Sequence, residues 1–155
     1  MKILIVFESN YGNTKLVAEK IMEGAKEVGS VEVFQKELKE VDVDKIPEYD
    51  VILIGSPNHM GGPTRGIKGF IDKLGELGME GKMFAVFDTY MGRDFEKALK
   101  KMEKRVKERN KGFKQIMPGL SIKVNGIKGP IMESEILKCK EFGRNIAIAV
   151  QPRRE

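Results

Sequence analysis

The sequence is poor in the residues that build disulfides and metal centres. Its 155 residues include one cysteine, one histidine and no tryptophan. A single thiol excludes an internal disulfide and any cysteine-built zinc or iron–sulfur centre, because these need several thiolates. His59 likewise cannot form a metal site alone. Cys139 falls on a helical spacing that it shares with Ile136, Gly143, Ile146 and Val150. We therefore expect Cys139 to fill the core, with a redox role as the alternative.

Long apolar runs are also missing. No run reaches the roughly 18 residues that a membrane span needs. The first residues, MKILIVFESNYGNT, carry charge and turn residues where a secretory signal would stay apolar. The length is that of one domain, and 41% hydrophobic residues suffice for one core. We expect a single domain over residues 1–155, in the cytoplasm and not at a membrane.

Charge is abundant, and its excess is local. Charged residues make up 33% of the chain, and the formal net charge is +5. Residues 93–111 hold nine basic and four acidic residues, which accounts for the whole excess. We expect one basic helix here, as a solvated face or as a docking surface for an acidic partner, and we do not expect nucleic acid as the partner. The high charge and the absence of tryptophan are typical of a thermophile's protein.

Short apolar runs alternate with helical patterns along the chain. The runs predict buried strands of a parallel sheet at 2–7, 31–34, 51–54, 83–87 and 120–124. Apolar residues at spacings of three and four predict helices at 17–28, 67–74, 95–106 and 136–150. The polar link 37–50 contains Pro47 and is expected to hold at most a short helix. This alternation predicts an open α/β sheet with helices on both faces, which binds ligands at the carboxyl ends of its strands.

The segment after the first predicted strand, Glu8-Ser9-Asn10-Tyr11-Gly12-Asn13-Thr14, runs straight into a helical pattern. Its backbone amides, two hydroxyl groups and the positive end of a helix dipole favour a phosphate. The chain has neither G-x-x-x-x-G-K-S/T, which binds nucleoside triphosphates, nor G-x-G-x-x-G, which binds a pyrophosphate. A single terminal phosphomonoester fits best. A capped helix with a glycine turn is the alternative.

The first strand and the loop after it resemble the signature of the flavodoxin family. Every position that the signature specifies is matched, by Ile5, Val6, Phe7, Ser9, Gly12, Thr14, Ala18 and Ile21. The resemblance covers essentially the whole chain, including the turn 126–130 before the last helix, and implies the short-chain form of the family. It implies a flavodoxin-like, doubly wound five-stranded parallel sheet in the order 2-1-3-4-5, with FMN as the cofactor.

Two further segments resemble the loops that flank the flavin ring in this family. Residues 55–63 follow the third predicted strand, and residues 88–92 follow the fourth. The resemblance implies that Tyr90 stacks on the ring, whereas His59 and Met60 stand where many flavodoxins have an aromatic residue. It also implies a backbone carbonyl that turns toward the flavin N5–H. We favour the peptide between Met60 and Gly61, because glycine tolerates positive φ.

The resemblance therefore implies cofactor contacts in three segments. In the first they are Ser9, Asn10, Tyr11, Gly12, Asn13 and Thr14. In the second they are Ser56, Pro57, Asn58, His59, Met60 and Gly61. In the third they are Asp88, Thr89, Tyr90, Met91 and Gly92. No catalytic or metal-ligating residue is expected.

In such a protein the flavin supplies the redox chemistry and the chain supplies binding and electrostatics. We expect an electron carrier that docks redox partners, including acidic ones, near the flavin edge and residues 93–111. The first alternative is a flavodoxin-like NAD(P)H-dependent quinone or FMN reductase. The second is a flavodoxin fold without flavin. A phospho-receiver is disfavoured, because Gly55-Ser56-Pro57 stands where a receiver needs an aspartate.

Overall fold

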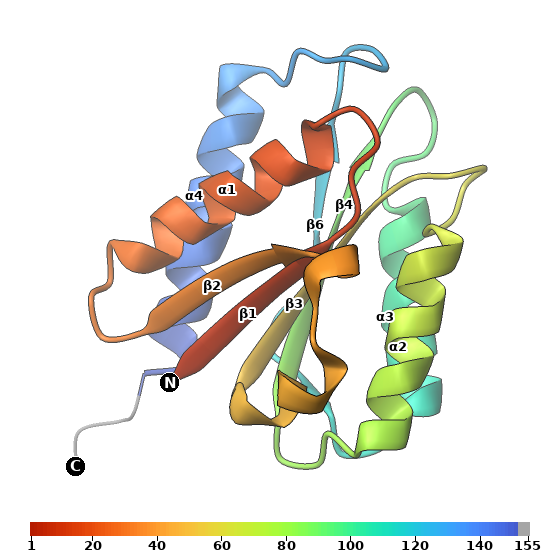
Figure 1. The fold of residues 1–155 in the computed structure, drawn as a ribbon. Coiled ribbons are helices and arrows are strands. Elements are labelled where there is room, and N and C mark those ends of the chain that lie inside the picture. The colour runs from red at the N-terminus through yellow and green to blue at the C-terminus, as the bar shows by residue number, and fades with distance from the viewer. Residues whose placement is uncertain (152–155) are drawn as a thin grey trace.

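The computed structural model describes residues 1–151. A parallel sheet lies between two layers of helices, with α1 and α4 on one face and α2 and α3 on the other (Figure 1). The elements follow one another as β1 (Lys2–Phe7), α1 (Asn13–Lys26), β2 (Glu32–Glu37), η1 (Leu38–Glu40), η2 (Val43–Glu48), β3 (Val51–Pro57), α2 (Arg65–Leu77), β4 (Met83–Tyr90), α3 (Lys97–Arg109), β5 (Lys114–Gln115), β6 (Leu120–Lys123) and α4 (Glu133–Ala149).

The sheet has the order β2-β1-β3-β4-β5, and all of its pairings are parallel. This confirms the predicted α/β class and strand order. The fifth position is shared by two short strands. The first, β5, pairs with the beginning of β4 at Met83, and the second, β6, pairs with its end from Phe87 onward. The pattern at 120–124 predicts β6 and misses β5, which is two residues long and polar.

The central strands are buried on both sides, which explains their unbroken apolar runs. In β1 the side chains of Ile3, Ile5 and Phe7 pack in the cluster under α1 and α4. The alternate side chains, Leu4 and Val6, pack in the cluster under α2 and α3. The polar link 37–50 is expected to hold at most one short helix, and it forms two short 3-10 helices, η1 and η2. Within residues 1–151, every helix is too short or too polar to cross a lipid bilayer.

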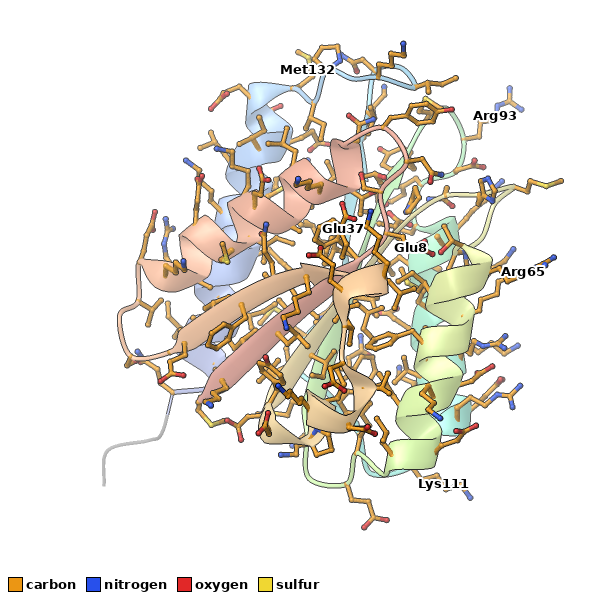
Figure 2. The ribbon with its side chains drawn as sticks, viewed as in Figure 1. Glu8, Glu37, Arg65, Arg93, Lys111 and Met132 are labelled. Carbon is orange, nitrogen blue, oxygen red and sulfur yellow. The ribbon has the colours of Figure 1, made fainter. Side chains whose placement is uncertain are left out.

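The basic helix begins later than the pattern at 95–106 predicts, because α3 begins at Lys97 and ends at Arg109. It is also shorter than the basic run 93–111. The prediction that Phe95 belongs to the buried stripe of this helix is therefore wrong. Its side chain is 55% exposed and packs edge-on against Tyr90, with ring centroids 5.3 Å apart. The helix still holds seven basic and two acidic residues, so it carries the charge excess. Figure 2 shows Arg93 and Lys111 at opposite ends of the molecule. The basic run therefore extends along the molecule and is not gathered at one end of it.

Two glycines let α1 and α4 cross with their backbones in contact. A β-carbon at Gly24 would lie 1.9 Å from the carbonyl oxygen of Lys140, and one at Gly143 would lie 1.9 Å from that of Ile21. Cys139 is buried on the same side of α4, as predicted, and burial with the nearby charge of Glu135 raises the pKa of its thiol to about 12. The α1–α4 layer therefore depends on residues with small side chains.

Gly143→Ala should destabilise the fold, because the new β-carbon would meet backbone atoms that cannot rotate away. Overpacking of this kind costs about 1 to 3 kcal/mol of unfolding free energy. The matched control is Gly69→Ala in α2, where nothing lies within 4 Å of the added carbon. That change should stabilise the protein by about 0.5 to 1 kcal/mol through helix propensity. Urea unfolding of both variants checks the pair, and equal shifts would contradict the close crossing.

Candidate functional site

Four loops surround a cleft at the carboxyl ends of the strands. Parallel strands end at the same edge of a sheet, so the segments after β1, β3, β4 and β6 meet there (Figure 1). The cleft has a volume of about 300 Å³ and is lined by Ser9, Asn10, Tyr11, Asn13, Thr14, Pro57, Asn58, His59, Thr89, Tyr90, Met91, Asp94, Val124, Gly126 and Ile127. This volume is at the lower end of the roughly 300 to 1,000 Å³ found for small-molecule sites.

Three predicted segments meet in this cleft, although not every predicted residue lines it. Eleven do, and the six that do not are Gly12, Ser56, Met60, Gly61, Asp88 and Gly92. Four lining residues were not among the expected contacts, namely Asp94 and the three residues of the last loop, Val124, Gly126 and Ile127. The last loop also follows a predicted strand, so the rule that located the other segments could have found it.

The loop after β1 is arranged around the hydroxyl group of Ser9. The Ser9 Oγ accepts hydrogen bonds from the amides of Gly12, at 3.0 Å, and Lys15, at 3.3 Å. Gly12 has φ of 90°, a conformation that favours glycine, and precedes the first turn of α1. The amides of Asn13 and Thr14 find no acceptor within residues 1–151. Unpaired amides at the positive end of a helix favour an anion.

Two other side chains join this loop to its neighbours. Thr14 is buried, and its Oγ1 lies 2.9 Å from Oγ1 of Thr89 at the end of β4. Asn13 donates from Nδ2 to the carbonyl oxygen of Ile127 at 2.8 Å. The side-chain amide of Asn13 therefore connects two loops, whereas one hydroxyl of the Thr14–Thr89 pair keeps a hydrogen that it can donate into the cleft.

Glu8 would repel an anion, but its carboxylate lies on the other side of the loop. It accepts a hydrogen bond from Oγ1 of Thr64, the residue that caps α2. It also lies against Gly66, where a β-carbon would be 2.3 Å from Oε1. Figure 2 shows Glu8 between the end of β1 and α2. The part of this loop that lines the cleft, residues 9–14, therefore contributes no carboxylate to it.

Residues 59–62 form a tight turn beside the cleft. His59 and Gly62 exchange backbone hydrogen bonds of 2.7 and 3.2 Å. The two central residues, Met60 and Gly61, have φ of 54° and 74°. Positive φ at both positions is typical of a type I′ turn, and it is uncommon for methionine. Met60 is fully exposed, so nothing in the described chain packs over its side chain.

Tyr90 forms part of the wall of the cleft. Its ring is half-buried at the end of β4 and lines the cleft. Burial and the charge of Glu135 raise the pKa of its hydroxyl. The hydroxyl therefore stays protonated, and the ring offers a neutral aromatic face to a flat ligand.

Beneath the cleft, the buried carboxylate of Asp88 connects three elements. It accepts hydrogen bonds from Oγ of Ser121 on β6, at 2.5 Å, from the amide of Leu99 on α3, at 2.9 Å, and from Nδ2 of Asn58, at 3.1 Å. Asn58 in turn accepts from the amide of Ala98 at 3.0 Å. The side chain of Glu96, the N-cap residue of α3, makes no capping hydrogen bond. The side chains of Asp88 and Asn58 instead accept hydrogen bonds from amides in the first turn of α3. Burial raises the pKa of Asp88.

The fold and the site define a doubly wound α/β protein with a loop of unpaired amides after its first strand. Residues 5–132 match the family model described as Flavodoxin, and the chain belongs to the flavodoxin family. This family binds FMN. A loop with unpaired amides and no carboxylate, together with an aromatic wall, provides the groups that a phosphorylated flat cofactor requires, so the residues present fit FMN.

Known proteins resemble the chain in sequence and in structure. A flavodoxin of Clostridium saccharobutylicum is 37% identical over 89 residues, which cover 57% of this chain and 56% of that protein. The match thus spans little more than half of that relative. A solved flavodoxin from the domain Archaea is 28% identical, with a TM-score of 0.82 over 96% of this chain and 97% of that one. Oxidised flavodoxin 2 from Bacillus cereus is 29% identical, with a TM-score of 0.81 over 96% and 99%.

Asp88 should make the free energy of unfolding rise as the pH falls, whereas an ion-paired carboxylate such as Asp72 makes it decrease. Its raised pKa means that ionisation costs folding free energy, and this cost disappears as the pH falls through the raised pKa. Asp88→Asn keeps the shape of the side chain and removes the titration. We therefore expect the wild type to gain unfolding free energy relative to Asp88→Asn as the pH falls from neutral into the acidic range.

The matched control is Asp72→Asn. The hydrogen-bonded guanidinium of Arg105 lowers the pKa of Asp72, so the wild type should lose stability relative to this variant over acidic pH. Urea unfolding of all three proteins at a series of pH values checks both signs. Parallel pH profiles for Asp88→Asn and the wild type would contradict the burial of an ionisable group at position 88.

Proposed function

We propose that the chain is a single cytoplasmic domain that holds one FMN and carries electrons between redox partners. The observation that carries this proposal is the loop after β1. It combines unpaired amides, the hydroxyls of Ser9 and Thr14 and the N-terminus of α1, and presents no carboxylate to the cleft. This is a site for one phosphate group on a ligand whose remainder lies between the other loops.

The phosphate would be held by the amides of residues 10–14 and by the hydroxyl groups at Ser9 and Thr14. Ser9 already accepts two backbone hydrogen bonds, so its own hydrogen is available to an anion. Thr14 can donate to the phosphate while it accepts from Thr89. Lys15, exposed in the first turn of α1, adds a positive charge nearby.

The flat ring of the cofactor would lie between the turn at 59–62 and the loop at 88–92. We expect Tyr90 to stack on the ring. Two tyrosines line the cleft, and Tyr90 is half-buried whereas Tyr11 is 61% exposed. His59 and Pro57 line the other side. The peptide between Met60 and Gly61 is the proposed adjustable group, since Gly61 tolerates either sign of φ.

Bound FMN supplies the electron-carrying chemistry. The chain binds the cofactor, orients it and limits the access of water to it, and no side chain is required as a nucleophile. The partners proposed are redox proteins, including acidic ones, that dock near the exposed edge of the cleft and the basic residues after Met91. Bleaching of the purified yellow protein by NADH or NADPH would favour a flavodoxin-like quinone or FMN reductase instead.

Thr14→Val should weaken FMN binding and leave riboflavin binding unchanged, because the hydroxyl is proposed to contact only the phosphate. Loss of a charge-assisted hydrogen bond costs about 1.5 to 3 kcal/mol, or one to two decades in affinity. Quenching of flavin fluorescence on binding gives both dissociation constants. Riboflavin serves as the control for damage to the fold. Equal affinities of the wild type for FMN and riboflavin would contradict the phosphate site.

Tyr90→Ala should weaken FMN binding by about 1 kcal/mol or more, because it removes the stacking face. Tyr90→Phe keeps the face and should change affinity little. His59→Ala is the matched control on the other wall, where no large aromatic face is lost, and should have the smaller effect. Absorption spectra and dissociation constants of the three variants check this order. An unchanged flavin spectrum in Tyr90→Ala would place the stacking residue elsewhere.

A further inference from the structure

A second cleft, of about 260 Å³, lies between α2 and α3, on the face of the sheet away from α1 and α4. Figure 1 shows the two helices side by side along this face. The groove is lined by Pro63, Lys68, Lys101, Lys104, Arg105 and Glu108. Four of these six side chains are basic, so the groove attracts anions.

The basic side chains of the groove differ in whether they are already paired. Arg105 forms a bidentate pair with Asp72, with distances of 2.9 and 2.7 Å, and Lys104 lies 3.9 Å from Glu108. Lys68 and Lys101 form no ion pair within residues 1–151. Lys68 is in the first turn of α2, and Lys101 lies against Gly62, so both are near the end of the groove that meets the 59–62 turn.

The lysines of α3 also cover this turn. A β-carbon at Gly62 would lie 3.5 Å from Cδ and 3.7 Å from Nζ of Lys101, and one at Gly61 would lie 3.6 Å from Cδ of Lys97. The turn is held to α3 below this contact by Asn58, which accepts from the amide of Ala98. A Lys101 ammonium that moved to an anion in the groove would leave Gly62.

We propose that the groove between α2 and α3 binds adjacent carboxylates of an acidic redox partner through Lys68 and Lys101, and that this binding withdraws Lys101 from the 59–62 turn. The inference rests on the proposed function, because the turn borders the proposed flavin site. Docking would then change the surroundings of the adjustable Met60–Gly61 peptide at the moment when the partner is in place.

Carboxylates fit this groove better than a nucleic-acid backbone does. Arg105, whose planar guanidinium is the group best suited to phosphate, is already occupied by Asp72. The two unpaired ammonium groups match one or two carboxylates, whereas binding to nucleic acid depends on many phosphate contacts along a track. The charge of α3, with seven basic and two acidic residues, is complementary to an acidic protein surface.

The test is a titration of the ¹⁵N-labelled, FMN-loaded protein with a hexaglutamate peptide, followed by NMR. We expect amide shifts at residues 60–62 and around Lys68 and Lys101 that weaken as salt is added. Lys68→Gln and Lys101→Gln should each weaken peptide binding about two- to fivefold, which is the range for an exposed ion pair. The control is Lys111→Gln, which removes a lysine that follows the C-terminal end of α3 and does not line the groove, and it should leave binding unchanged (Figure 2).

The two groove variants also separate docking from its effect on the turn. At saturating peptide, Lys68→Gln should still shift the amides of residues 60–62, whereas Lys101→Gln should not. Turn shifts that persist in Lys101→Gln, unchanged affinity in both variants, or tighter binding of a hexathymidylate than of hexaglutamate would overturn the inference. A chain that does not bind FMN contradicts the proposed function instead, and that result comes from the flavin titration and not from the peptide.

Discussion

The buried carboxylate of Asp88 is the interaction on which the geometry of the cleft depends. Through Ser121, Leu99 and Asn58 it connects the end of β4 with β6, α3 and the loop after β3. The first turn of α3 obtains its caps from this network, since Glu96 supplies none. The basic helix α3 is therefore hydrogen-bonded to the same loops that form the cleft. A displacement of α3 would move these loops, and a displacement of the loops would move α3.

The parts of the fold that could be predicted are those where local pattern and burial agree. The run from Ile3 to Phe7 is apolar because both faces of β1 are covered, and the glycine and hydroxyl residues after it have the composition of an anion-binding loop. The strand order and the place of the cleft follow from the alternation of strands and helices. The convergence of residues 9–14, 57–59 and 89–91 was predictable for the same reason.

The remaining features depend on contacts between residues far apart in the sequence. Asp88 resembles a cleft residue by position, yet its partners on β6 and α3 draw its side chain below the cleft. Phe95 has the spacing of a buried helical residue, but the chain turns at Glu96, with φ of 58°, and leaves it outside α3. Asn13 has the chemistry of a phosphate ligand, and only its distance to the Ile127 carbonyl reveals that it joins two loops.

The exposed thioether of Met60 gives the 59–62 turn a chemical weakness. No described side chain shields its sulfur, and exposed methionines are the ones that oxidants reach first. Addition of one oxygen turns an apolar side chain into a polar one, at a position whose backbone already has an uncommon φ. Oxidation of the protein in air should therefore begin beside its own cleft, while Cys139 of α4 stays protected in the core.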